Sequence, residues 1–313
     1  MALPNHLNVV VNAYNPPQTV ELAGRAGVAK ANMRPDKAFI SAVLAGMLLG
    51  FACAVTMSTE TAPWYQHNAP GLIRMIGAIV FPFGLVMIVT SGLELVTANF
   101  MITIIPVLQR RLSILKMLKH WFIVFWGNLA GSLFLVAIIT GYGGVFSKEP
   151  YRGEAIRFAQ SKAVTPEWHM IFLRAIGANW LVCMSCFLAF QAREFFSKVM
   201  AIWWPTFAFV ALGLDHTVAN MYFIPTAIFV GAPDITVGYY IWKSLIPTVL
   251  GNIVGGGLFV GVVQWYLHQS SEPPVAIDGK YYDGDQSPLI GQTTSQAPQI
   301  GREQERKSSE AMV

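Results

Sequence analysis

The sequence predicts an all-α polytopic membrane protein with six spans, arranged as two inverted three-span repeats. Hydrophobic residues make up 54% of its 313 residues and charged residues only 12%, whereas soluble domains carry roughly 25% charged residues. Two apolar segments are too long for one straight helical crossing, which takes about 20 residues, and each has a polar cluster in its middle. The third observation is that the two halves of the chain share ordered motifs.

Composition also argues against several functions. The net charge of +4 is small, and no basic run interleaved with aromatic residues indicates a nucleic-acid partner. The three cysteines, Cys53, Cys183 and Cys186, lie in apolar runs, and an odd number argues against a disulfide framework. No cluster of cysteines and histidines has the spacing of a zinc site, so we expect neither a metal nor a cofactor.

The chain begins with a polar, basic segment, residues 1–37. This segment lacks the apolar region of a cleavable signal peptide, so we expect the first span to act as the insertion signal. Residues 20–31 have the composition of an amphipathic helix that lies on the membrane surface. The first span covers residues 38–57, where alanine and glycine permit close helix packing, and a loop follows at residues 58–70.

The second span, residues 71–106, has about 36 residues, far more than one crossing needs. Its middle reads Ser-Gly-Leu-Glu-Leu-Val-Thr-Ala-Asn over residues 91–99, and Glu94 is its only carboxylate. We therefore expect this span to break near the membrane midplane. A basic connection, residues 107–118, leads to the third span at residues 119–141.

The fifth span repeats this anomaly. A mixed-charge loop, residues 142–167, and the fourth span, residues 168–190, precede it. The fifth span covers about residues 200–229 and contains Gly-Leu-Asp-His-Thr-Val-Ala-Asn at residues 213–220. An ionisable residue at membrane depth is energetically costly and is therefore a candidate functional residue. His216 is the one histidine in the middle of a predicted span.

The sixth span covers residues 241–267, and the polar residues 268–313 after it are expected to form a disordered tail. The predicted organisation is thus an N-terminal segment, a transmembrane domain over residues 38–267 and a tail. Lysine and arginine gather in the N-terminal segment and after spans 2 and 4, which places both termini in the cytoplasm of a plasma-membrane protein. The loop between spans 3 and 4 fits this orientation least well, because acidic residues alternate with its basic ones.

The internal repeat consists of two paired motifs at offsets of 121 and 124 residues. In each broken span a glycine precedes an asparagine by seven residues, and each following span carries a Gly-Asn-x-x-Gly sequence. Three spans are an odd number, so two copies in one membrane have opposite topology, with the functional site where their broken helices meet. The motifs are Gly92 to Asn99 with Gly213 to Asn220, and residues 127–131 with residues 251–255.

The breaks favour an anion at the midplane. The half-helix after each break begins with unpaired backbone N–H groups, and the positive end of a helix attracts negative charge. We expect Asn99 and Asn220 to satisfy the broken backbone, and Glu94 and Asp215 to be matched structural acids of the two loops. His216 can donate a hydrogen bond or exchange a proton near neutral pH. The alternative is a core histidine bonded to a neighbouring span.

At this point the residues resemble the formate/nitrite transporter family. The resemblance covers about residues 35–268, and the chain looks most like the fungal nitrite transporters because of its basic N-terminal segment and polar tail. Two departures are Ala98, where the family usually has glycine, and Asp215, where it usually has glutamate. The motifs that carry the resemblance are residues 213–221, 179–183, 250–257 and 95–99.

The resemblance implies an aquaporin-like protomer in a homopentamer, with one pore per protomer and no enzymatic activity. It implies transport of nitrite, or a similar small monoanion such as formate, with a proton, and a role in nitrate assimilation. The family's central histidine corresponds to His216 and its break-loop threonine to Thr97. Its vestibule asparagines correspond to Asn179 and Asn252, and its vestibule lysine to Lys162, to within about one residue. Its apolar constrictions correspond to Phe81, Leu85, Leu95 and Phe209.

Two questions stay open at this point. The solute either passes the constrictions as a neutral acid, protonated by His216 or by water beside it, or passes as an anion to which His216 only donates a hydrogen bond. A neutral-solute channel for water or ammonia also suits an inverted repeat. The Asn-Pro-Ala pairs expected of such channels are absent, because the corresponding sites are residues 97–99 (Thr-Ala-Asn) and 218–220 (Val-Ala-Asn).

Overall fold

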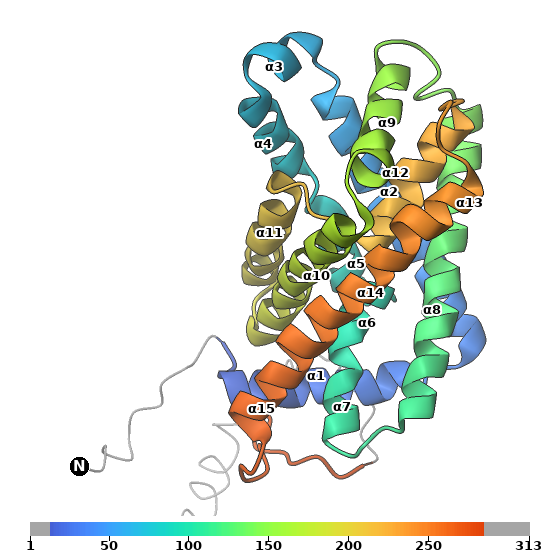
Figure 1. The fold of residues 1–313 in the computed structure, drawn as a ribbon. Coiled ribbons are helices and arrows are strands. Elements are labelled where there is room, and N and C mark those ends of the chain that lie inside the picture. Colours follow the sequence, from blue (N-terminus) through green and yellow to red (C-terminus); the bar gives the residue numbers. More distant parts are fainter. Residues whose placement is uncertain (1–12, 285–313) are drawn as a thin grey trace, which may run out of the picture.

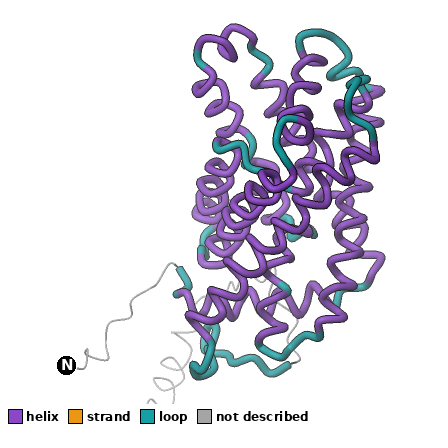
Figure 2. The backbone as a smooth tube through the Cα atoms, viewed as in Figure 1, coloured by secondary structure: helices purple, strands orange, loops and turns teal. Residues whose placement is uncertain are grey.

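The computed structural model describes residues 13–284, whose regular elements are all helical (Figures 1 and 2). Most helices run side by side along one direction, and α1 lies across one end of the bundle, which we call the α1 end. The short helices α3 and α9 lie at the opposite end, called the α9 end.

The first half of the chain forms a long helix pair and an interrupted span. Helix α2 packs along α8, while α4 to α7 form the interrupted span. The bounds are α1 Pro16–Ala31, α2 Pro35–Glu60, α3 Pro63–Asn68, α4 Pro70–Val80, α5 Phe83–Thr90, α6 Val96–Ile102, α7 Ile104–Leu108, α8 Ile114–Phe134 and the π-helical segment η1 Leu135–Tyr142.

The second half repeats this order after an extra helix, α9. Helix α10 packs against α14 and η4, as α2 packs against α8. The bounds are α9 Tyr151–Ala159, η2 Gln160–Val164, α10 Trp168–Gln191, α11 Phe195–Ala211, α12 Thr217–Phe229, α13 Val237–Tyr240, η3 Ile241–Leu245, α14 Ile246–Asn252, η4 Ile253–Val262 and α15 Val263–Gln269.

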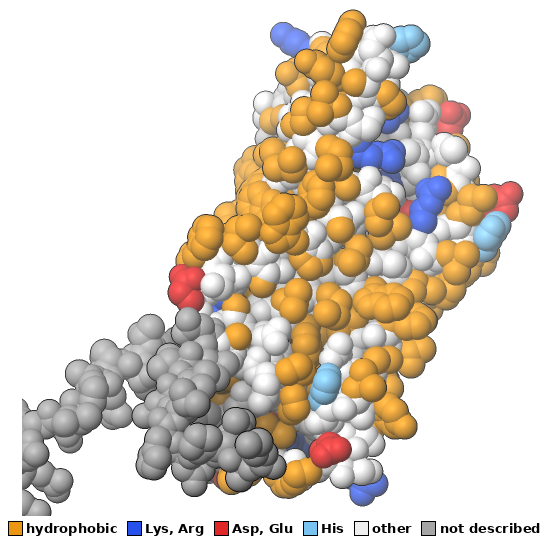
Figure 3. All heavy atoms as spheres, turned by 90° about the vertical axis from the view of Figure 1, so that its left-hand side faces the viewer, with side chains coloured by type: hydrophobic (Ala, Val, Ile, Leu, Met, Phe, Trp, Pro, Cys, Tyr) orange, Lys and Arg blue, Asp and Glu red, His pale blue; other side chains and the backbone are white. Residues whose placement is uncertain are grey.

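Among residues 13–284, five helical stretches are long and apolar enough to cross a membrane, which makes this a polytopic membrane protein. Figure 3 shows hydrophobic side chains over much of one face, with charged side chains mainly towards the two ends. Three shorter apolar helical stretches flank the two breaks. The five stretches are Pro35–Glu60, Pro70–Thr90, Ile114–Tyr142, Trp168–Gln191 and Val237–Gln269.

Several boundaries differ from those read from the sequence. The first span begins at Pro35, because proline at the first helical turn costs no hydrogen bond. The predicted loop 142–167 contains α9 and η2. Helix α1 covers the end of the bundle, with Val20 and Ala23 fully buried, so it lies against protein as well as any membrane surface.

The predicted tail divides in two. Residues 268–284 have defined contacts with α1, so they are not the disordered chain that composition suggested. Residues 285–313, and residues 1–12 of the N-terminal segment, lie outside the described residues. For them the earlier expectations stay predictions.

Glycines permit the two long helix pairs to approach closely. A Cβ atom added to Gly131 of α8 would overlap the backbone carbonyl oxygen of Val43 on α2. A Cβ atom added to Gly255 of η4 would overlap the carbonyl oxygen of Ile176 on α10. In a membrane, where association depends on such packing, small residues bring helix backbones together. The Gly-Asn-x-x-Gly motifs therefore mark the closest helix contacts in both halves.

We predict that Gly131→Val destabilises the protein, because the neighbouring backbone has no room to yield. Overpacking typically costs about 1–3 kcal/mol. Thermal unfolding in detergent, followed by circular dichroism, measures the effect. Gly238→Val is the matched control, since nothing lies within 4 Å of the position of its added Cβ atom. Equal melting temperatures for the two variants would contradict this account of the helix pair.

Candidate functional site

Both interrupted spans break at a glycine with positive φ. Gly92, after α5, has φ of 68°, and Gly213, after α11, has φ of 69°. Only glycine adopts this backbone region without strain. In each case the chain then runs extended to Leu95 or His216, the residue that precedes the next half-helix. The two breaks predicted from the sequence are therefore present at the predicted positions.

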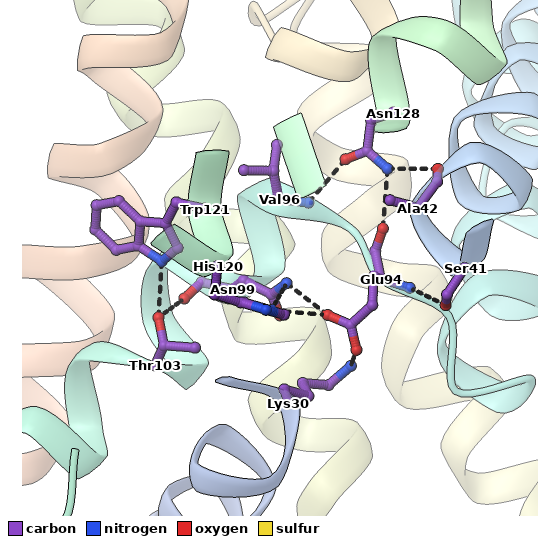
Figure 4. Close-up of polar contacts among 10 residues, drawn as sticks. All are labelled: Lys30, Ser41, Ala42, Glu94, Val96, Asn99, Thr103, His120, Trp121 and Asn128. Carbon is purple, nitrogen blue, oxygen red and sulfur yellow. Dashed lines mark hydrogen bonds and ion pairs between the residues drawn. The ribbon is translucent and has the colours of Figure 1, made fainter. Parts of the chain in front are cut away.

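A buried asparagine holds the first break loop (Figure 4). Asn128 of α8 accepts a hydrogen bond from the Val96 backbone N–H at 2.9 Å. Its amide donates to the carbonyl oxygens of Ala42 at 2.8 Å and Glu94 at 2.9 Å. One side chain thus joins α2, α8 and the start of α6.

Asn252 of α14 does the same for the second loop. Its oxygen accepts from the backbone N–H of Thr217 at 2.8 Å and from the Thr217 hydroxyl at 2.7 Å. Its amide donates to the carbonyl oxygens of Ala175 at 2.8 Å and Asp215 at 3.1 Å. Sequence reasoning gave Asn252 a role in the solute pathway and gave Asn128 none. In the structure both asparagines bind the same kinds of backbone group. The Gly-Asn motif that they share was therefore the sequence signal that could have identified Asn128.

The Glu94 carboxylate is fully buried and has three side-chain partners (Figure 4). Lys30 of α1 donates to it at 2.6 Å, and Asn99 donates at 2.8 Å. The Nε2 atom of His120, on α8, lies 3.1 Å from the same carboxylate. A buried carboxylate needs such partners, because an isolated charge in this environment is very costly. Lys30 and His120 were both missed, since they lie 64 and 26 residues away in the chain.

Asp215 occupies the matching position in the second loop. Lys162 of η2 lies 3.3 Å from its carboxylate and donates to the carbonyl oxygens of Gly213 at 2.9 Å and Leu214 at 2.7 Å. Asn220 donates to Asp215 at 3.4 Å. Each loop thus has one acid, one lysine and one asparagine. Lys30 reaches its loop from the α1 end and Lys162 from the α9 end.

His216 joins the two halves. Its Nδ1 atom accepts from the Ala219 backbone N–H at 3.3 Å, capping α12, so in the neutral ring the proton lies on Nε2. Nε2 lies 2.8 Å from the Thr97 hydroxyl oxygen and donates to it in this tautomer. His216 is thus a buried histidine bonded to a neighbouring span. It also lines a cavity, as a solute-binding residue would.

The cavity beside His216 is small, and most of the side chains that line it are apolar. The Phe81 and Phe209 rings pack edge to face, 5.4 Å apart, and the Phe209 ring lies 5.9 Å from the His216 ring. The four predicted constriction residues line it together with His216, and sequence reasoning missed the other three. The lining residues are Leu49, Phe81, Leu85, Leu95, Val182, Thr206, Phe209 and His216.

Asn179 of α10 holds the threonine that His216 contacts. Its amide donates to the carbonyl oxygens of Thr97 at 3.0 Å and Asn252 at 2.7 Å, and the Cys183 thiol lies 3.4 Å from the Thr97 carbonyl oxygen. The amide hydrogens of Asn179 and Asn252 are therefore engaged by protein. The side-chain carbonyl oxygen of Asn179 is buried without a protein partner.

Within residues 13–284, no group of three or more His, Cys, Asp or Glu side chains is arranged to hold a metal ion. The three cysteines are free and buried. The arrangement is instead suited to passage: an apolar constriction, one histidine that can donate a hydrogen bond, and a lysine on each side.

Comparison with known proteins agrees with this geometry. A family model described as "Formate/nitrite transporter" matches residues 17–266. A probable formate transporter of Methanothermobacter thermautotrophicus is 32% identical over 268 residues, covering 81% of this chain and 97% of the relative. The formate channel FocA of Haemophilus influenzae is 30% identical over 276 residues, covering 82% of this chain and 95% of the relative.

Two solved structures have similar folds. A pentameric formate channel with formate bound superposes with a TM-score of 0.66 at 28% identity, covering 75% of this chain and 98% of that one. An ion channel of the FNT family superposes with a TM-score of 0.69 at 25% identity, covering 80% of this chain and 98% of that one.

We predict that Lys30→Met strongly destabilises the protein, because it leaves Glu94 buried without its cation. Removing one partner of a buried pair costs about 3–5 kcal/mol. The double variant Lys30→Met/Glu94→Gln should recover much of this loss, since no charge stays buried. Unfolding in detergent measures both effects, with Lys37→Met, an exposed lysine, as control. Additive losses in the double variant would show that the pair is not coupled.

Proposed function

The chain belongs to the formate/nitrite transporter family, and we propose that it moves nitrite, or a similar small monoanion such as formate, together with a proton through a pore in each protomer. Its relatives are channels and transporters, so the chain is a transport protein and not an enzyme. The observation that carries the proposal is His216, which lines an apolar cavity and is hydrogen-bonded to Thr97 across the two half-helix starts.

The cavity is an unfavourable environment for an anion that has lost its hydration water. Moving a charge to the centre of a membrane costs several kcal/mol, about 2.5 kcal/mol even on the lowest scales. Phe81, Phe209 and Leu85 offer no hydrogen bond to replace hydration. A neutral acid passes these side chains at far lower cost. The proton therefore has to join the anion before the constriction is crossed.

The flanking lysines attract the anion first. Lys162 and Lys30 place positive charge beside the two break loops, and the half-helix starts add their partial charges. The anion reaches His216, whose Nε2–H donates to it in place of the Thr97 hydroxyl. A proton delivered by water from the entry side then joins the anion while Nε2–H stays hydrogen-bonded to it, and transfer from the ring itself requires that Nδ1 first take up a proton from the same side. The acid dissociates after the constriction, so one anion and one proton cross together.

The remaining residues have supporting roles in this proposal. Phe81, Leu85, Leu95 and Phe209 narrow the pathway, and Asn179 holds Thr97 beside His216. Asn252 holds the second break loop. The break loops are held by two acids and two asparagines, Glu94 and Asp215 with Asn99 and Asn220.

We propose the same architecture that the repeat suggests: six spans in two inverted halves, aquaporin-like, assembled as a homopentamer. The matching partners of Asn128 and Asn252 support the inverted halves. The pentameric formate channel with a similar fold supports the assembly. We place the protein in the plasma membrane with both termini, and hence the α1 end, in the cytoplasm. Nitrite uptake for nitrate assimilation suits this placement.

We predict that purified protein in liposomes moves nitrite faster as the external pH falls, because the acid external solution supplies the co-transported proton. Formate and water, measured in the same liposomes, establish selectivity. His216→Phe should abolish the pH-dependent flux, whereas His169→Phe should not, since that histidine lies at a helix start with a largely exposed side chain.

Three outcomes distinguish the alternatives. Unchanged nitrite flux in His216→Phe excludes a part for His216 in the proton-linked mechanism. A nitrite current without proton movement in the wild-type protein indicates an anion channel, in which His216 only donates a hydrogen bond. Fast water flux with no nitrite flux indicates the neutral-solute channel.

A further inference from the structure

The segment after α15 turns back along α1 and ends in a rigid turn. Ile277 and Lys280 exchange two backbone hydrogen bonds of 2.9 Å. Between them, Asp278 and Gly279 have φ of 47° and 80°, the positive values of a type I′ turn. Gln18 of α1 donates to the carbonyl oxygen of Ala276 at 3.4 Å. The turn therefore presents residues 278–282 to the α1 end in one conformation.

Asp278 forms the first anchor of this turn. Its carboxylate accepts from the Tyr14 hydroxyl at 2.9 Å and from Arg193, in the α10–α11 connection, at 2.9 Å. The Arg193 guanidinium lies over the Tyr14 ring, 4.6 Å from its centroid. Burial and the hydrogen bond to Asp278 both raise the pKa of Tyr14, so the phenol keeps the proton that it donates.

Tyr282 forms the second anchor. The guanidinium of Arg111 lies 4.1 Å from the centre of its ring and that of Arg25 lies 5.9 Å away. Arg25 also donates to the Lys280 carbonyl oxygen at 3.0 Å. Guanidinium groups over an aromatic face bind it through the ring quadrupole. The turn is thus recognised by an acid and, four residues later, an aromatic ring.

The receiving surface is preorganised by a buried acid. Glu21 of α1, only 2% exposed, accepts from Arg25 at 2.8 Å and from Arg111 at 2.9 Å through both of its oxygens. This carboxylate sets the two guanidinium groups in place beside the Tyr282 ring. The part of the surface formed by Arg25 and Arg111 therefore does not have to be assembled by the segment that occupies it.

The same surface joins elements that reach the break loop. Arg111 follows α7, the far end of the interrupted span, and Arg25 lies on the helix that brings Lys30 to Glu94. Exposed ion pairs and cation–π contacts are individually weak, and Asp278 is 52% exposed. These exposed contacts are therefore weaker than the buried contacts of Glu21.

We propose that Tyr14, Arg25, Arg111 and Arg193 form a docking surface whose occupant is residues 276–282 of this chain, an acidic and aromatic turn that reversibly clasps α1 to the end of the bundle. With the clasp docked, α1 is restrained over α7 and Lys30 is kept on Glu94. With the clasp released, α1 gains mobility relative to the break loop. This restraint does not depend on which solute is transported.

Hydrogen–deuterium exchange of the full chain in nanodiscs tests the clasp. The double variant Asp278→Ala/Tyr282→Ala should exchange the amides of Pro16–Ala31 roughly three- to thirtyfold faster than wild type, as expected for losing one exposed ion pair and one cation–π contact. Tyr281→Ala is the matched control, because that neighbouring ring is 62% exposed, and its exchange should equal wild type. Exchange in the double variant equal to wild type would overturn the proposal.

A charge exchange excludes a general loosening of the surface. Asp278→Arg alone should speed α1 exchange, and Asp278→Arg with Arg193→Asp should recover part of the protection by re-forming the ion pair in reverse, since an arginine cannot accept from Tyr14. Failure of the second change to recover any protection would show that Asp278 does not dock through Arg193. Both readouts are structural and need no nitrite flux, so they stand or fall independently of the proposed transport mechanism.

Discussion

The structure depends on hydrogen bonds to the polar backbone groups of two extended loops that lie inside an apolar bundle. Within a membrane, irregular backbone persists only where protein or trapped water replaces the missing hydrogen bonds. Asn128 and Asn252 meet this requirement with three matching hydrogen bonds each. Each accepts from one backbone N–H at the half-helix start and donates to two carbonyl oxygens. With these bonds made, α6 and α12 can begin inside the bundle instead of at one of its ends.

The symmetry of these supports makes the exceptions informative. Leu95 stands where the second loop has His216, so only one half-helix start carries a polar side chain into the cavity. The second exception is Asn179 of α10. The corresponding position in α2 is Gly46, whereas the Asn179 amide donates to the Thr97 carbonyl oxygen. Both exceptions act on Thr97, one through the hydroxyl and one through the carbonyl. The two polar side chains that break the symmetry therefore both contact Thr97, where the two halves meet.

Sequence patterns predicted the features that depend on local composition and internal repetition. Span length and glycine position located both breaks, and the lone mid-span histidine located His216. The patterns did not predict Lys30, which lies in a segment that looked like a surface helix, because its partner Glu94 is 64 residues away. They missed the contacts of Asp278 and Tyr282 for the same reason, since a polar tail composition does not reveal a receiving surface more than 80 residues distant.

The two lysines differ in how firmly their loops hold them. Lys30 lies 2.6 Å from Glu94, whose other oxygen also has His120 and Asn99 as partners. Lys162 lies 3.3 Å from Asp215 and otherwise contacts only backbone carbonyl oxygens, and the second oxygen of Asp215 is buried without a protein partner. A closely paired cation gives less net attraction to a passing anion than a loosely paired one. Lys162 is therefore the less tightly paired of the two cations, whereas Lys30 is held firmly enough to support the first break loop.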